Sequence, residues 1–147
     1  MLNERKLFGK AQRASAICEI YRDFKEYCEK ELKNYELDGG LYFFLLYIYK
    51  HPGRTYSDLA EHIQSDKGHT SRGLQRLEME GYIFLESDPK KMEDMKINIT
   101  PKGEITMEEI KNIFENWEDI VFQNLSSEER ILILDLLRKV ETTKSEI

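Results

Sequence analysis

The chain has 147 residues, a formal net charge of −6 at pH 7 and 40% hydrophobic residues, which suits one domain with a buried core. Its longest apolar run, 41–49, is far shorter than the ~20 residues that cross a bilayer, so we expect no membrane partner. The first ten residues lack an apolar stretch of signal-peptide length, so we expect a cytoplasmic protein.

Two helices are predicted in the N-terminal third of the chain. Between 7 and 33, apolar residues recur at steps of three and four, which is the spacing of one helix face. Asp38 can cap a second helix over 39–50, and the turn at 51–53 ends it. Because this second helix is apolar nearly all round, we expect it to lie at the centre of the domain.

A helix-turn-helix is predicted next. Thr55, followed by an Asp three residues later, resembles the start of a capping box for a short helix over 56–63. Asp66 can cap a second helix over about 67–80, and Gly81 is placed to end it at the C′ position.

Two strand-like segments, 82–85 and 95–99, follow the second helix. The tip of the hairpin between them spans 87–94 and contains two adjacent lysines. A helix-turn-helix followed by such a β-wing places its second helix in the major groove of DNA. Nucleic acid is therefore the partner that this order of elements favours.

Two further helices are predicted toward the C-terminus. The Thr100-Pro101 pair favours a helix start, and this helix extends to about residue 123. Ser126 and Glu129 form a capping box for a last helix over 127–142.

The acidic net charge does not exclude DNA, because the charges are unevenly distributed. Residues 1–103 hold 17 basic and 17 acidic side chains, whereas residues 104–147 hold five basic and eleven acidic ones. From Lys67 to Leu77 there are three fixed positive charges, one histidine and no carboxylate. Phosphate binding depends on the local field within a Debye length of ~8 Å, so this basic stretch can act independently of the total.

The front of the helix over 67–80 is the predicted reading surface. Arginine pairs with guanine and glutamine with adenine in the major groove, although a solvated helix face is the alternative interpretation. The hairpin lysines can bind DNA or simply protect an exposed strand edge, and the N-terminus of the helix over 56–63 can hold a phosphate. The residues that we predict to contact DNA are Ser57, Lys67, His69, Ser71, Arg72, Gln75, Arg76, Lys90 and Lys91.

These segments together resemble the winged-helix core of the MarR-family transcription regulators. The matching stretches are Asp58-Leu-Ala-Glu-His-Ile, Asp66-Lys-Gly-His-Thr-Ser-Arg, Leu77-Glu-Met-Glu-Gly-Tyr-Ile and Ile99-Thr-Pro-Lys-Gly. The flanking helices also match that family's layout, so the resemblance covers nearly the whole chain. It implies a homodimer on a pseudo-palindromic operator, usually a repressor released by a small ligand or by oxidation.

The expected fold is mainly α (α+β), a winged helix-turn-helix with long N- and C-terminal dimerisation helices. Because the apolar stripes of the first and last helices exceed what one small domain can cover, we expect these helices to pair between two subunits. The predicted division is a single winged-helix domain over 1–147, with a DNA-binding core at 37–103 and dimerisation helices at 1–36 and 104–147.

The wing departs from the family pattern in its charges. The family usually carries an Asp and, two residues later, an Arg that enters the minor groove, whereas those positions here hold Lys91 and Glu93. Leu85 stands where a basic residue is usual. These departures favour an alternative function, a winged-helix protein-interaction module that has lost DNA binding.

A cysteine-based redox sensor of the same fold is a further alternative, since the first helix contains Cys18 and Cys28. A reactive thiol needs a lowered pKa, and cysteines in the apolar middle of a helix are mostly core residues.

Aromatic side chains suggest a cleft for a small aromatic effector such as a phenolic compound, although aromatic residues at helical spacing are more often plain core. The residues of this band are Tyr21, Phe24, Tyr27, Tyr42, Phe43, Phe44, Tyr47 and Tyr49.

We expect no metal ion, no other cofactor and no catalytic activity. His51, His62 and His69 fall in different predicted elements, with no second histidine or cysteine three or four residues away. The sequence contains neither a Gly-rich phosphate loop nor a nucleophile elbow, so we do not expect an enzyme.

Overall fold

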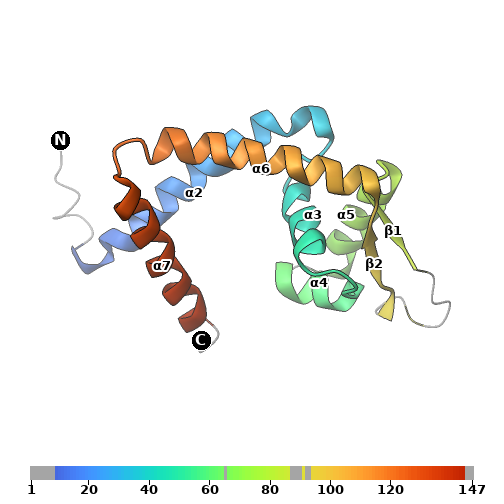
Figure 1. Cartoon of the computed structure of the whole chain (residues 1–147). Helices are drawn as coiled ribbons and strands as arrows, with labels where there is room; N and C mark the ends of the chain where they lie inside the picture. The colour runs from blue at the N-terminus through green and yellow to red at the C-terminus, as the bar shows by residue number, and fades with distance from the viewer. Residues whose placement is uncertain (1–8, 65, 87–90, 92–93, 145–147) are drawn as a thin grey trace. The chain divides into compact units, whose positions relative to one another are not determined.

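The computed structural model describes residues 9–64, 66–86, 91 and 94–144 (Figure 1). The chain divides into two compact units, Met1–Ile113 and Phe114–Ile147. The first unit contains η1 (Gly9–Ala11), α2 (Gln12–Glu31), η2 (Lys33–Tyr35), α3 (Leu41–Lys50), α4 (Tyr56–Ile63), α5 (Lys67–Met79), β1 (Ile83–Leu85), β2 (Ile97–Ile99) and the start of α6 (Pro101–Val121). The second unit contains the end of α6 and α7 (Ser127–Lys144).

This mainly helical winged-helix fold confirms the predicted fold class. In Figure 1, α3, α4 and α5 lie together beside the β1–β2 hairpin. Helix α3 is the centre of the first unit, as its composition predicted. Its buried side chains are Leu41, Tyr42, Phe44, Leu45 and Ile48.

The predicted caps of the helix-turn-helix are present. The Thr55 hydroxyl accepts the backbone N–H of Asp58 at 3.2 Å, and the Asp58 carboxylate accepts the N–H of Thr55 at 3.0 Å. These hydrogen bonds lower the pKa of Asp58 below its usual range. Asp66 accepts the N–H of His69 at 2.7 Å, and Gly81 follows α5 with φ of +78°. In the second unit, the Ser126–Glu129 capping box is formed at 2.8 and 3.1 Å.

One predicted cap is wrong. Helix α3 begins at Leu41 with Gly40 as its N-cap, and no side chain caps it. Gly39 and Gly40 both have positive φ, +65° and +85°, so the chain turns too sharply for Asp38 to reach the first turn. The Asp38 carboxylate instead binds Arg76.

The hairpin is joined to the helix-turn-helix by a third extended segment. Strands β1 and β2 pair antiparallel with Ile83 opposite Ile99, and Thr55 forms a bridge with Lys96 on the other edge of β2. The Ile97 N–H donates to the Arg54 carbonyl at 3.0 Å. The wing and the start of α4 therefore share one backbone hydrogen-bond network.

The Thr100–Gly103 segment locks α6 against the end of α5. The Thr100 hydroxyl donates to the Gly81 carbonyl at 2.6 Å and accepts the Gly103 N–H at 3.1 Å. Lys102 donates to the Glu80 carbonyl, and its ammonium lies 4.6 Å from the centre of the Tyr82 ring.

Replacing Gly103 by alanine should destabilise the fold. A Cβ there would lie 2.3 Å from the Tyr82 carbonyl oxygen and 2.6 Å from Ile99 Cγ1, and neither backbone nor strand can move aside easily. We expect the free energy of unfolding in urea to fall by about 1–3 kcal/mol, as for other overpacked sites.

Gly68→Ala is the matched control for this prediction. An added Cβ there would lie 3.1 Å from Arg72 Nη1 and 3.3 Å from Asp66 Oδ1, and both are side-chain atoms that can shift by a few tenths of an ångström. We expect that variant to be about as stable as the wild type, because the small helical preference for alanine offsets the shift of these two side chains. Equal stabilities of the two variants would contradict the packing argument.

Among the described residues, the helices are too short or too polar for any of them to traverse a lipid bilayer.

Candidate nucleic-acid interface

Helix α5 is seated on the core by one face. Thr70, Leu74 and Leu77 are buried, as the sequence pattern predicted. Gly73 faces Phe44 so closely that an added Cβ would lie 2.3 Å from Phe44 Cε2. The helix can approach α3 this closely only because position 73 has no side chain, and the opposite face is turned outward.

The outward face of α5 carries the predicted cationic and amide side chains. Lys67, His69, Arg72 and Gln75 are all exposed. Asp66 stands just before them, and its carboxylate accepts the His69 N–H, which lowers its pKa. The positive charge of Arg72 lowers it further. The front of the helix therefore presents donors to a ligand, and the acid that precedes it in sequence is part of the cap.

Ser71 is partly buried and has a partner inside the protein. The Tyr56 hydroxyl lies 2.8 Å from the Ser71 hydroxyl and donates to the Lys67 carbonyl at 2.6 Å. Tyr56 is only 3% exposed, so this bond fixes the first turn of α5 on α4. The role of Tyr56 was not predicted, because an aromatic residue at the start of a helix signals only burial.

Arg76 also has partners inside the protein. Its Nη2 lies 2.9 Å from Glu36 Oε2 and 3.2 Å from Asp38 Oδ1. These carboxylates lie between α2 and α3, about forty positions away in sequence, and no local pattern could have indicated the contact.

The residues predicted to contact the DNA backbone lie in two segments, the first turn of α4 and the hairpin. Ser57 is exposed in the first turn of α4. Lys91 is exposed in the hairpin, whereas Lys90 and Glu93 lie outside the described residues.

Two exposed basic residues near the start of α4 were not among the predicted ones. Arg54 and Lys96 belong to the two segments that the Thr55–Lys96 bridge joins. Arg54 is close enough to Asp58 to contribute to its lowered pKa. They were missed because the pairing of residue 55 with β2 has no signature in the sequence.

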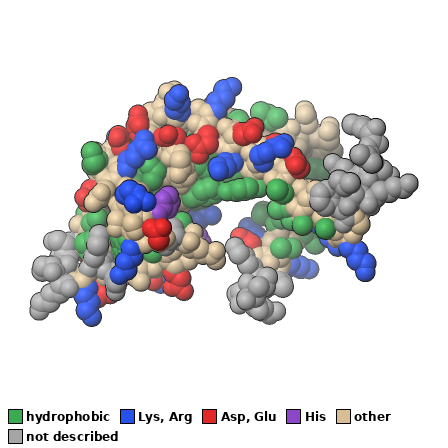
Figure 2. Space-filling view, turned by 180° about the vertical axis from the view of Figure 1, so that it is seen from behind, with side chains coloured by type: hydrophobic (Ala, Val, Ile, Leu, Met, Phe, Trp, Pro, Cys, Tyr) green, Lys and Arg blue, Asp and Glu red, His purple; other side chains and the backbone are tan. Residues whose placement is uncertain are grey.

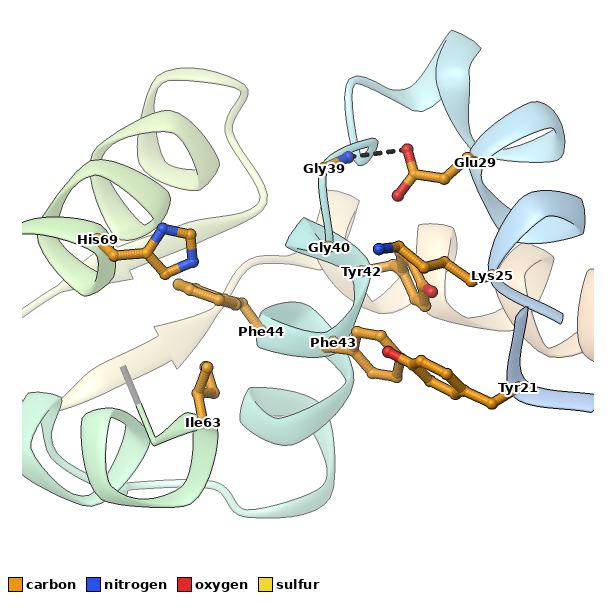
Figure 3. A pocket seen from close by; sticks show the side chains of 10 residues that line it. All are labelled: Tyr21, Lys25, Glu29, Gly39, Gly40, Tyr42, Phe43, Phe44, Ile63 and His69. Carbon is orange, nitrogen blue, oxygen red and sulfur yellow. Dashed lines mark hydrogen bonds between the residues drawn. The ribbon is translucent and has the colours of Figure 1, made fainter. Parts of the chain in front are cut away.

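A cavity of about 490 Å³ adjoins α5 within the first unit (Figure 3). Tyr21 points toward Phe43 on one side of it, and His69 of α5 lies beside Phe44. Glu29 accepts the Gly39 N–H at 3.0 Å, as the dashed line in Figure 3 marks. The residues that line the cavity are Tyr21, Lys25, Glu29, Gly39, Gly40, Tyr42, Phe43, Phe44, Ile63 and His69.

The two cysteines differ in environment. Cys28 is fully buried, and burial raises the pKa of its thiol to about 11. A thiol with a raised pKa is a poor nucleophile at neutral pH, so Cys28 is unsuited to redox sensing. Cys18 is exposed on α2.

The three histidines lie at two places in the structure. His51 and His62 both pack against the Tyr47 ring, with their own ring centres 6.4 Å apart, and His69 lies beside Phe44. Within the described parts of the chain, His, Cys, Asp and Glu side chains nowhere form a group of three that could hold a metal ion.

Comparisons with known proteins agree with this geometry. Residues 42–91 match the sequence model of the MarR family. The chain is 37% identical to the HTH-type transcriptional regulator BilQ of Clostridioides difficile (strain CD3), over 89% of this chain and 88% of BilQ. Its fold is similar to the crystal structure of MarR, with a TM-score of 0.81, 28% identity and coverage of 91% and 98%. It is also similar to a MarR transcriptional regulator from Methanosarcina mazei Go1, with a TM-score of 0.84, 26% identity and coverage of 98% and 99%.

Proposed function

Because this chain belongs to the MarR family of DNA-binding transcriptional regulators, we propose that it acts as a homodimeric repressor on a pseudo-palindromic operator. The exposed front of α5 carries the proposal, since Lys67, Arg72 and Gln75 project from it in a stretch free of carboxylates. Two such helices in a symmetric dimer reach successive major grooves ~34–36 Å apart.

The contacts divide between bases and phosphates. Within α5, we propose that Lys67, His69, Arg72 and Gln75 face the groove, because all four are exposed on its outward side. A second set of exposed residues is proposed to bind the backbone on either side of the groove. These residues are Arg54, Ser57, Lys91 and Lys96, and Lys90 stays in this set as a prediction from the sequence.

Exposed apolar side chains support the proposed dimer. Monomeric proteins rarely expose large contiguous apolar patches, yet α7 has a row of large apolar residues that are 47% exposed or more, and Figure 2 shows hydrophobic side chains reaching the surface. Ile17 and Ile20 of α2 are also exposed, at 56% and 44%. The exposed residues of α7 are Ile131, Leu132, Leu134, Leu136, Leu137 and Val140.

The cavity beside α5 supports modulation by a small aromatic ligand. Its volume of about 490 Å³ falls in the usual range for ligand sites, and it combines aromatic walls with the polar ends of Lys25 and Glu29. Because His69 of the reading helix forms part of the wall, a bound ligand would contact the helix that reads DNA.

A binding assay tests the proposed function. A duplex is first recovered by the protein from a random-sequence pool, and its affinity is then measured by gel shift over a range of salt. We expect the logarithm of the binding constant to fall by about 0.9 per log unit of salt for each phosphate neutralised. A phenolic compound that binds the cavity should release the duplex.

Failure to recover any duplex, even at ~50 mM salt where phosphate contacts are strong, would contradict the proposal. That result would favour the protein-interaction alternative.

A further inference from the structure

Arg76 differs from the other cationic side chains of α5. Arg72, one turn earlier, is exposed at the front of the helix, whereas Arg76 lies in the last turn and is only partly exposed. One guanidinium nitrogen, Nη2, contacts both Glu36 and Asp38 at 2.9 and 3.2 Å. The positive charge is thus neutralised by two carboxylates of the protein itself.

These carboxylates belong to the α2–α3 connector, which we define as residues 33–38. The connector is anchored in the core by Leu37, which is fully buried. It makes a second contact beyond the end of α5, because the Tyr82 hydroxyl donates to the Tyr35 carbonyl at 2.6 Å. The connector therefore holds the C-terminal end of α5 at two points, one within the helix and one just after it.

Different contacts fix the other parts of α5. Its first turn is held by the hydrogen bond from Tyr56 to the Lys67 carbonyl, and its middle by the close approach of Gly73 to Phe44. Apolar packing has little directionality, whereas charged hydrogen bonds fix orientation. The Arg76 contact is thus suited to set the angle at which the last turn of α5 lies.

We infer that Arg76 is a positioning residue of the reading helix and not a DNA contact, and that Glu36 and Asp38 are its counterparts. The inference rests on the proposed function only in that α5 reads the DNA. Base recognition requires groups to be held within about 0.5 Å and 10–20° of the productive geometry. Loss of the contact should therefore lower specific affinity while the protein stays folded.

The competing interpretation makes opposite predictions. If Arg76 turned to a phosphate in the complex, Glu36 and Asp38 would hold it back and repel the DNA. Neutralising the two acids would then strengthen binding. If Arg76 positions the helix, neutralising them weakens binding to the selected sequence.

Two variants separate these interpretations. Arg76→Gln removes the cation, and Glu36→Gln combined with Asp38→Asn removes the acids while keeping shape. The probes are a duplex recovered by the wild type from a random-sequence pool and a scrambled duplex of equal length. We expect each variant to bind the selected duplex roughly 3- to 10-fold more weakly, with no added loss when they are combined. Binding to the scrambled duplex should not fall, and the salt slope should stay that of the wild type.

Arg22→Gln is the matched control, because Arg22 Nη2 also contacts two carboxylates, Glu19 at 2.8 Å and Asp23 at 3.2 Å, but on α2. We expect its binding to be unchanged. Circular dichroism should show that all variants are folded, and sedimentation equilibrium should show that they keep the oligomeric state of the wild type, because α2 belongs to the proposed dimer surface. Unchanged or tighter binding after removal of Glu36 and Asp38 charges would overturn the inference. A smaller salt dependence of binding in Arg76→Gln would also overturn it. A decrease of about 0.9 per protomer in the slope of log binding constant against log salt indicates a lost phosphate contact. If the wild type recovers no duplex at all, the proposed function itself has failed.

Discussion

Replacing Lys67 and Arg72 together by alanine should lower affinity for a selected duplex by about 10³-fold or more. Each lost base or phosphate contact contributes about 1–3 kcal/mol, and two residues in each subunit of the proposed dimer remove four contacts. Both side chains are exposed at the front of α5, so truncation leaves the core untouched. Fluorescence anisotropy at fixed salt measures the affinity, and a salt series shows how many phosphate contacts were lost.

Removing two cations elsewhere provides the control. Arg22 and Lys30 are exposed on α2, and changing both to alanine alters the net charge by the same amount. We expect little change in affinity, since the local field and not the total charge governs phosphate binding. Because α2 belongs to the proposed dimer surface, sedimentation equilibrium should also show that this variant keeps the oligomeric state of the wild type. If the α5 variant keeps its affinity while folded, or if the α2 variant loses as much, α5 is not the reading helix.

Placing glutamate at Leu134 and Leu137 of α7 should dissociate the dimer. These side chains are 48% and 47% exposed in the single chain, and a charge in a buried interface is costly. Because a dimer gains from binding two half-sites at once, the monomer should bind a selected duplex about 10²- to 10⁴-fold more weakly. Sedimentation equilibrium gives the oligomeric state, and gel shift gives the affinity.

Gln123→Glu with Asn124→Glu is the control for added charge, because both residues are exposed and polar in the same unit. We expect this variant to stay dimeric. A wild-type protein that sediments as a monomer, or a Leu134 and Leu137 variant that remains dimeric, would contradict the assignment of α7 to the interface.

Local features of the fold could be predicted because their causes are local. The caps at Thr55, Asp66 and Ser126 depend on residues three positions apart, and Gly81 ends α5 through its own backbone freedom. Asp38 follows the same local pattern but does not cap α3, because a glycine pair redirects the chain and Arg76 attracts the carboxylate.

In the candidate site, too, only the features with local causes could be predicted from the sequence. Helical periodicity correctly placed Arg72 and Gln75 on the outward face of α5. It could not show that Tyr56 engages Ser71, or that pairing of Thr55 with Lys96 adds basic residues beside α4. Those contacts join segments 15 to about 40 positions apart, and only the folded chain brings them together.

The double pairing of β2 has a mechanical consequence. Since β2 is bonded to β1 on one edge and to the segment before α4 on the other, the wing cannot swing without carrying α4 along. In the proposed dimer, a change in the distance between the two α5 helices would therefore move α4, α5 and the β1–β2 wing of each subunit together as one rigid body.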